Sequence, residues 1–159
     1  MRSSAWPSAR ARPLFIRPAR SEELDGLGAL KLRASLAWGE LTDELNALPA
    51  ARRVPTEHLP HVFVAEVAGQ VVGYAAVLPR DDGEAELDDL FVAPEAWRQG
   101  VGARLMAEAE RRATALGGRA LHVISHPRAQ AFYEACGFQP AGEVTTSLGP
   151  APELWKVLT

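Results

Sequence analysis

The sequence contains a single cysteine, Cys136, among its 159 residues. One cysteine excludes an internal disulfide and a metal site built from several thiolates, and it is typical of a reducing compartment. No apolar run approaches the ~18 residues of a membrane-spanning helix, and the N-terminus lacks the apolar core of a secretory signal. We therefore expect a cytoplasmic protein without a membrane partner.

An excess of positive charge is also absent, since the net charge is −3 and the isoelectric point is near 5.8. The basic residues are spread along the chain, which argues against the concentrated positive surface that nucleic acids require. Hydrophobic residues make up 47% and charged residues 23%, as in ordinary globular domains. We expect one domain that does not bind nucleic acid.

The boundary of that domain is expected near residue 14, which leaves 14–159 as one folded unit. The first 20 residues carry five arginines and no acidic residue, so a mitochondrial targeting segment is an open alternative for this end. Pro7 and Pro13 would interrupt an amphipathic helix there. A flexible tail at 1–13 is the simpler interpretation.

The first half of the domain is expected to begin with a strand at Leu14–Arg17 and a helix capped by Ser21, with leucines at three-residue spacing facing inward. A short helix is expected at Thr42–Leu48. Three apolar runs separated by turn residues then predict an antiparallel meander. These runs are Val62–Val67, Val71–Leu78 and Glu84–Val92.

The second half should open with a long amphipathic helix from Val101 to Leu116, ended by two glycines. A strand at Ala120–Ile124 and a helix beginning at Pro127 follow, and two late strands complete the sheet. These late strands are expected at Gly142–Leu148 and Leu154–Leu158. The order predicts a mixed, mostly antiparallel α/β fold and fits a doubly wound Rossmann sheet poorly.

A turn with Gly100 and Gly102 joins the third meander strand to the long helix. Backbone N–H groups at a helix start lack carbonyl partners, and the helix dipole favours an anion there, so this turn is a candidate phosphate site. A Rossmann fingerprint would need glycine at Leu105, and a P-loop would need Lys-Ser/Thr in place of Ala103-Arg104. The sequence therefore has neither motif. In isolation, two glycines at this spacing more often mark a simple helix start.

Two segments give a specific resemblance. Val92-x-Pro94 with Gln99-Gly100-Val101-Gly102 resembles the pyrophosphate-binding segment of the GNAT acyltransferases, and Pro127–Phe138 is similar to the helix that this family carries near its C-terminus. The resemblance implies a central sheet with a splayed, V-shaped opening, and N-acetyl transfer from acetyl-CoA to a primary amine through a ternary complex, without a metal. Trp97 and His126 depart from the family pattern, which commonly has Arg or Gln and Asn there.

The same resemblance implies which residues surround acetyl-CoA. Its pantetheine would pair with the strand at Leu90–Val92, and its pyrophosphate would lie on the amides of 99–103, with Arg98 or Arg104 as charge partner. The expected cofactor-binding residues are Leu90, Phe91, Val92, Trp97, Arg98, Gln99, Gly100, Val101, Gly102, Ala103, Arg104, His126, Ala129, Phe132 and Tyr133.

For catalysis, the resemblance gives Tyr133 the role of donating a proton to the departing thiolate, although a tyrosine on an amphipathic helix is more often a core residue. The base that deprotonates the amine is left open among Glu86, Asp88, Asp89 and water. Strand alternation separates Asp89 from the other two, unless a bulge changes the phase, as the spacing of the neighbouring leucines suggests. These carboxylates equally fit a solvated strand end.

Other features carry weaker signals. His58 and His61 are expected in a loop rather than as metal ligands, and His122 as an ordinary strand residue. Cys136 is expected to be a packing residue. The sequence leaves open a catalytically degenerate acyl-CoA-binding sensor, a homodimer through the late strands, and the identity of the acceptor, which is a small molecule or a peptide amine.

Overall fold

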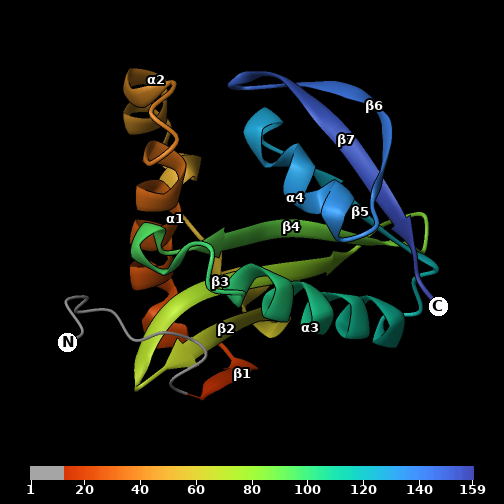
Figure 1. Ribbon diagram of the computed structural model, residues 1–159, viewed down its shortest axis with the longest axis horizontal. Coiled ribbons are helices and arrows are strands. Elements are labelled where there is room, and N and C mark those ends of the chain that lie inside the picture. The colour runs from red at the N-terminus through yellow and green to blue at the C-terminus, as the bar shows by residue number, and fades with distance from the viewer. Residues whose placement is uncertain (1–12) are drawn as a thin grey trace.

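The computed structural model describes residues 13–159, so the tail predicted at 1–13 lies almost entirely outside the described residues. The described residues form a sheet of seven strands in the order β1-β2-β3-β4-β5-β7-β6 (Figure 1). The strands are β1 (Leu14–Pro18), β2 (Val62–Val67), β3 (Gln70–Pro79), β4 (Ala85–Val92), β5 (Ala120–Ile124), β6 (Gln139–Thr146) and β7 (Gly149–Val157). The β4–β5 pair is parallel and the other neighbouring pairs are antiparallel, which confirms the predicted fold class.

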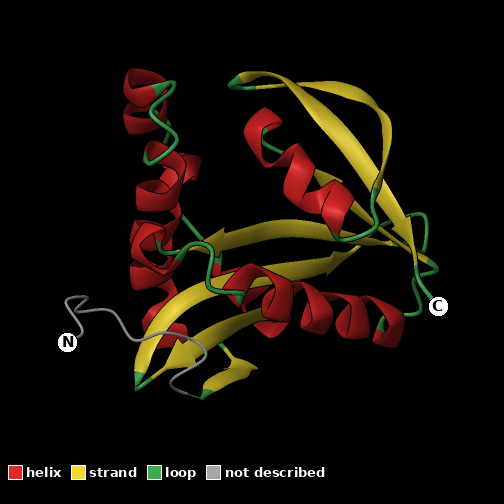
Figure 2. Ribbon diagram, in the orientation of Figure 1, coloured by secondary structure: helices red, strands yellow, loops and turns green. Residues whose placement is uncertain are grey.

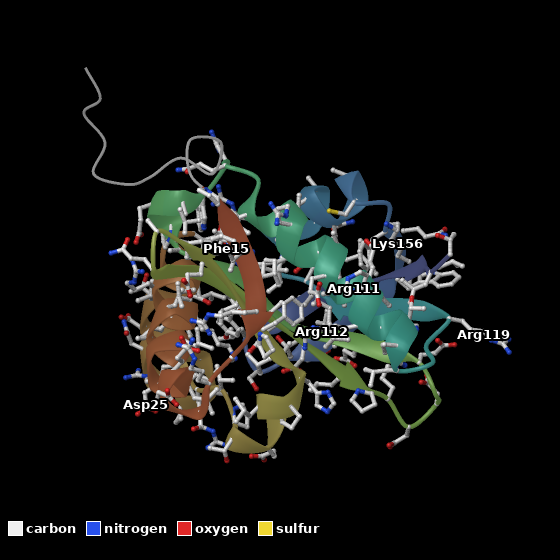
Figure 3. All side chains as sticks on the ribbon, turned by 90° about the horizontal axis from the view of Figure 1, so that it is seen from below. Phe15, Asp25, Arg111, Arg112, Arg119 and Lys156 are labelled. Atoms are coloured by element: carbon white, nitrogen blue, oxygen red, sulfur yellow. The ribbon has the colours of Figure 1, made fainter. Side chains whose placement is uncertain are left out.

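Helices cover both faces of the sheet (Figure 2). They are α1 (Leu24–Leu36), α2 (Thr42–Ala47), α3 (Val101–Ala115) and α4 (Gln130–Ala135), with 3-10 turns at Ser21–Glu23, Pro49–Arg52, Thr56–His61, Pro94–Ala96 and Pro127–Ala129. In the view from below, α1 with Asp25 and α3 with Arg111 and Arg112 lie on opposite sides of the sheet (Figure 3). None of the helices in residues 13–159 combines the length and the apolar character needed to cross a bilayer.

Strand alternation divides the core into two layers. Phe63, Leu87 and Leu105 belong to the layer between the sheet and α3, whereas Leu27 and Val64 belong to the layer beneath α1. Burying one such side chain fully contributes about 1.5–3 kcal/mol, so both layers hold the sheet rigidly between the helices. A rigid sheet is what positions the strand ends described below.

Gly28 explains why α1 tolerates glycine. A Cβ atom on Gly28 would collide with the carbonyl group of Arg52, while Gly26 has open space around it. The helix therefore approaches the 3-10 turn at Pro49–Arg52 at a distance that only glycine permits. This close packing offsets the loss of helix stability that glycine causes at position 28.

Two local predictions were wrong. Ser21 does not cap a helix; it lies inside a 3-10 turn. The carboxylate of Glu23 instead accepts a hydrogen bond from the Arg20 N–H at 2.8 Å and also pairs with Arg17.

The late strands begin earlier than expected and meet in a tight turn that contains Leu148. That turn is fixed by the Thr146 hydroxyl, which donates to the Gly149 carbonyl at 2.7 Å and accepts from the Leu148 N–H at 3.2 Å.

Candidate active site

The sheet opens between β4 and β5. These strands pair only from Ala85 to Leu87 and from Leu121 to Val123, although β4 continues to Val92. Across the described residues, the β4 segment from Asp88 onward therefore has no strand partner on the β5 side. This is the splayed opening that the resemblance implied.

Backbone groups of β4 point into this opening. The Ala93 N–H donates to the Val72 carbonyl at 2.9 Å. Because alternate residues of an antiparallel strand direct their backbone N–H and C=O groups to the neighbouring strand, those of Phe91 point to β3 and those of Leu90 and Val92 point away from it. The Val92 carbonyl accepts from Nε1 of Trp97 at 2.7 Å. The groups left for a ligand are both backbone groups of Leu90 and the N–H of Val92.

The N-terminus of α3 lies directly after this segment. Gly100 is its N-cap with φ of 83°, and no side chain caps the helix. The first backbone bond of the helix runs from the Arg104 N–H to the Gly100 carbonyl at 3.1 Å, so the amides of Val101, Gly102 and Ala103 lack helical partners. Together with the helix dipole, these amides make this end of the helix favourable for an anion.

The two glycines of this turn serve different purposes. Gly100 has open space around it and needs its positive φ. A Cβ on Gly102 would lie 3.2 Å from two ring atoms of Phe132, so Gly102 allows α3 to pack against α4. Sequence reasoning gave both glycines the same role in phosphate approach, because the partner of Gly102 is 30 positions away.

The polar side chains predicted around this turn differ in whether they are held by contacts within the protein. Nη2 of Arg104 donates to the Leu14 carbonyl at 3.2 Å, which directs this guanidinium toward β1. Arg98 is exposed at the turn with φ of 63°. Gln99 bonds the Glu95 carbonyl at 3.3 Å. Arg98 is therefore the better placed of the two predicted charge partners.

Tyr133 is the buried residue of α4. Its ring makes edge contacts with Phe132, 5.3 Å between centroids, and with Phe138, 5.6 Å between centroids, and Ala129 packs against the same core. Burial raises the pKa of the Tyr133 phenol, and Cys136 and then Asp89 add smaller increases. The phenol therefore stays protonated near neutral pH, as a hydrogen-bond donor must.

A β-bulge at Asp88 changes the face of the sheet to which Asp89 points. The register with β3 shifts so that Val77 pairs with Leu87 while Ala76 pairs with Asp89. Asp88 is the extra residue, and beyond it the side chains change face. The bulge that the leucine spacing suggested is therefore present, and it turns Asp89 toward α1 instead of the α3 layer that holds Leu87.

Asp89 is buried in a polar contact beneath α1. Its Oδ2 accepts from the Tyr74 hydroxyl at 3.0 Å, and its Oδ1 lies 3.4 Å from Nζ of Lys31. Burial raises the pKa of the Asp89 carboxyl to about 6, and the charge of Lys31 and the Tyr74 hydrogen bond oppose this rise. Burial also raises the pKa of Glu86, which is more exposed.

Three aromatic rings meet at the wide end of the opening. Trp38, at the end of α1, lies 5.1 Å from Trp97 and 5.3 Å from His126 between ring centroids. His126 accepts from the Arg128 N–H at Nδ1, and burial lowers the pKa of its imidazole. Sequence reasoning singled out Trp97 and His126 but missed Trp38, since nothing local to α1 marks it.

Other predicted residues are placed as follows. His58 and His61 lie in a 3-10 turn, and the described residues contain no group of three or more side chains suited to a metal ion. Cys136 packs against the core, and burial raises the pKa of its thiol, which disfavours a nucleophilic thiolate. His122 lies on β5, and its buried Nε2 has no hydrogen-bond partner in residues 13–159.

The comparisons agree with this architecture. The family model described as "Acetyltransferase (GNAT) family" matches residues 31–138, and the chain belongs to this family. Over 93 residues, it is 36% identical to an uncharacterised N-acetyltransferase of Mycobacterium bovis, covering 55% of this chain and 58% of that protein. The chain therefore spans little more than half the length of this relative.

Solved structures show the same fold. The PaiA N-acetyltransferase of Thermoplasma acidophilum, crystallised with coenzyme A, superimposes with a TM-score of 0.76 at 18% identity, covering 91% of this chain and 98% of its own. A GCN5-related N-acetyltransferase of Rhodopseudomonas palustris gives a TM-score of 0.74 at 22% identity, covering 91% and 95%. The yncA protein of Salmonella typhimurium, solved with acetyl-CoA, gives 0.69 at 20% identity, covering 92% and 94%.

Proposed function

We propose that this protein transfers an acetyl group from acetyl-CoA to a primary amine by direct attack within a ternary complex. One observation carries the proposal: the free backbone groups of Leu90 and Val92 lead from the opening to the uncapped start of α3, and α4, which carries the buried Tyr133, packs against that start through Phe132. PaiA and yncA, which share the fold, were crystallised with coenzyme A and acetyl-CoA respectively, which supports the same co-substrate here.

The residues present fit such a co-substrate. The amides of Val101, Gly102 and Ala103 would hold a pyrophosphate, with Arg98 beside them. Leu90 would pair with the pantetheine amides as an added strand does. Phe132 packs between α3 and α4 and would border the same ligand.

Acetyl-CoA supplies an acetyl group activated as a thioester. The Val92 N–H would stabilise the negative charge that develops on the carbonyl oxygen when the amine nitrogen forms its bond to the carbonyl carbon. Tyr133 would donate its phenolic proton to sulfur as the carbon–sulfur bond breaks. The proton lost by the attacking nitrogen passes to a base and then, through solvent, back to Tyr133, so the products are the N-acetyl amine and CoA thiol.

We assign the base to Asp89. Burial raises its pKa to about 6, and a base is most effective when its pKa lies near the working pH. Asp89 follows Leu87, the last β4 residue paired with β5, by two positions, so it lies where the opening begins. Asp89 would accept the proton directly or through one water.

A degenerate acyl-CoA-binding sensor is the alternative, and Trp97 favours it. Its Nε1 already bonds the Val92 carbonyl, so one contact otherwise free for pantetheine is occupied within the protein. Tight acetyl-CoA binding without CoA release across a broad panel of amines would support the sensor over the enzyme.

We also propose that the protein is cytoplasmic, because its sequence has one cysteine.

We further propose that it forms a homodimer through β6. β6 is the last strand of the sheet, and its residues from Gln139 to Glu143 are exposed, which leaves an edge open for pairing. Light scattering coupled to gel filtration would distinguish a monomer from a dimer.

The decisive experiment is thermal melting with and without acetyl-CoA. A ligand at 100 times its Kd adds about 2.7 kcal/mol, which corresponds to a shift of roughly 5–10 °C for a domain of this size. Gly100→Asp places a negative charge at the anion site, and Gly100→Asn is its neutral control of the same shape and backbone strain. We expect the shift to decrease from wild type to Asn and to vanish in Asp; no shift in wild type at millimolar ligand would refute the proposal.

A further inference from the structure

Part of the sheet face on the α1 side is open. α1 packs against β3 and β4, whereas Ile124 on β5 and Val157 on β7 remain 45% and 52% exposed. The side chains on this open face are those that alternate with Leu121, Val123 and Leu154, which point into the α3 layer. They are Glu86 on β4, His122 and Ile124 on β5, and Glu153, Trp155 and Val157 on β7.

Two aromatic rings form the floor of this face. His122 is paired in register with Glu86 on one side and with Trp155 on the other. The His122 and Trp155 rings are stacked, with centroids 6.4 Å apart and planes inclined by 20°. Nε2 of His122 is buried without a hydrogen-bond partner among the described residues, so the floor also holds one unused polar atom.

The charge of the face is predominantly negative. Glu153 is close enough to Glu86 to raise the pKa of that carboxyl, and Arg80, 4.0 Å from Glu86, is the cation that opposes them. Asp88 adds a third carboxylate at the rim, 3.7 Å from His58. Three carboxylates beside one guanidinium attract a cation and repel an anion.

This face leads directly to the opening. The Glu86–His122 pair is the second-to-last before β4 and β5 separate, and Asp88 is the first β4 residue beyond their last pair. A molecule lying on Trp155 and His122 would therefore reach the start of the opening with its nearer end. That end is beside Asp88 and Asp89, where the proposed reaction needs the amine nitrogen.

We propose that this face, formed by Glu86, His122, Glu153 and Trp155, binds the acceptor and selects a cationic primary amine that has a flat aromatic body and no carboxylate. The inference rests on the proposed function for the location of the acetyl group. The stacked rings bind the aromatic body, and the carboxylates bind the ammonium group. An amino acid with the same body carries a carboxylate that the face repels.

Matched probes test each half of this proposal. 2-Phenylethylamine, phenylalanine and ethylamine are compared as acceptors by CoA release from acetyl-CoA, and 2-phenylethylamine binding is measured by calorimetry with and without CoA. Phenylalanine adds only the carboxylate, and ethylamine removes only the ring. We expect kcat/KM to be at least tenfold higher for 2-phenylethylamine than for either comparator.

Variants link the preference to the face. Trp155→Leu should reduce the advantage of 2-phenylethylamine over ethylamine about tenfold, and Glu153→Gln should raise the KM for 2-phenylethylamine roughly two- to fivefold with the KM for acetyl-CoA unchanged. Glu143→Gln is the control, because Glu143 pairs with Pro152 and thus lies on the other face of the same hairpin. It should behave as wild type.

Two results would overturn the inference: equal use of phenylalanine and 2-phenylethylamine, or a Trp155→Leu variant with unchanged preference. Absence of 2-phenylethylamine binding in calorimetry would overturn it as well. Failure of the proposed function looks different. If no amine releases CoA but 2-phenylethylamine still binds and Trp155→Leu weakens that binding, the face stands and the acetyl transfer does not.

Discussion

The Tyr74 hydroxyl donates to the Asp89 carboxylate at 3.0 Å, and both residues are buried beneath α1. This hydrogen bond stabilises the charged carboxylate and so lowers the pKa of Asp89, against the larger effect of burial, which raises it to about 6. Burial therefore dominates the pH at which the proposed base becomes available, and the contact lowers that pH.

Replacing Asp89 with Asn should reduce kcat by about 100-fold, which is within the usual contribution of a general base. In wild type, kcat/KM should fall as pH drops through about 6, because the base becomes protonated. This limb should be absent in the variant. Asp81→Asn, at the exposed β3–β4 turn, is the control, and pH–rate profiles of all three proteins decide the matter.

Replacing Tyr74 with Phe should move the decrease in kcat/KM at acidic pH to a higher pH without removing it. The variant loses a hydrogen bond that lowers the pKa of Asp89, so burial acts with less opposition. A limb that stays in place in the variant would show that Asp89 is not the group observed in the rate profile.

The raised pKa of Asp89 also makes the free energy of unfolding depend on pH. Its pKa rises from 3.8 in the unfolded chain to about 6 in the fold, so the folded state binds more protons between these values. Stability should therefore fall as pH rises from about 4 to 6, by up to about 3 kcal/mol from this group. Urea unfolding of wild type and Asp89→Asn across this range should show wild type losing stability relative to the variant by this amount.

Replacing Tyr133 with Phe should lower kcat about 10- to 100-fold and leave the melting shift with acetyl-CoA nearly unchanged. The phenol is proposed to act only as sulfur departs, while the ring contacts with Phe132 and Phe138 persist in the variant. Unchanged turnover would remove Tyr133 from the mechanism and leave it a core residue.

The two glycines of α1 should respond in opposite directions to alanine. Gly28→Ala should destabilise the protein by about 2 kcal/mol, because the added Cβ meets the Arg52 carbonyl group. Gly26→Ala should stabilise it by about 1 kcal/mol through helix propensity alone. Differential scanning calorimetry of both variants checks the signs, and destabilisation by Gly26→Ala would contradict the account of α1.

The sequence by itself determined the features that depend on neighbouring residues. The β2–β3–β4 meander, the extent of α3 and the glycine turn before it follow from side-chain periods of two and 3.6 and from turn residues. The same local patterns carried the family resemblance, because Gly100 and Tyr133 lie in short motifs.

Tertiary structure decided which distant residues meet. The bulge at Asp88 was suggested by the leucine spacing, but only packing placed Asp89 against Lys31 and Tyr74. Trp38 meets His126 across 88 positions, and no local pattern in α1 indicates that contact. Such contacts depend on how helices and strands pack in three dimensions, and a period of two or 3.6 residues carries no information about that packing.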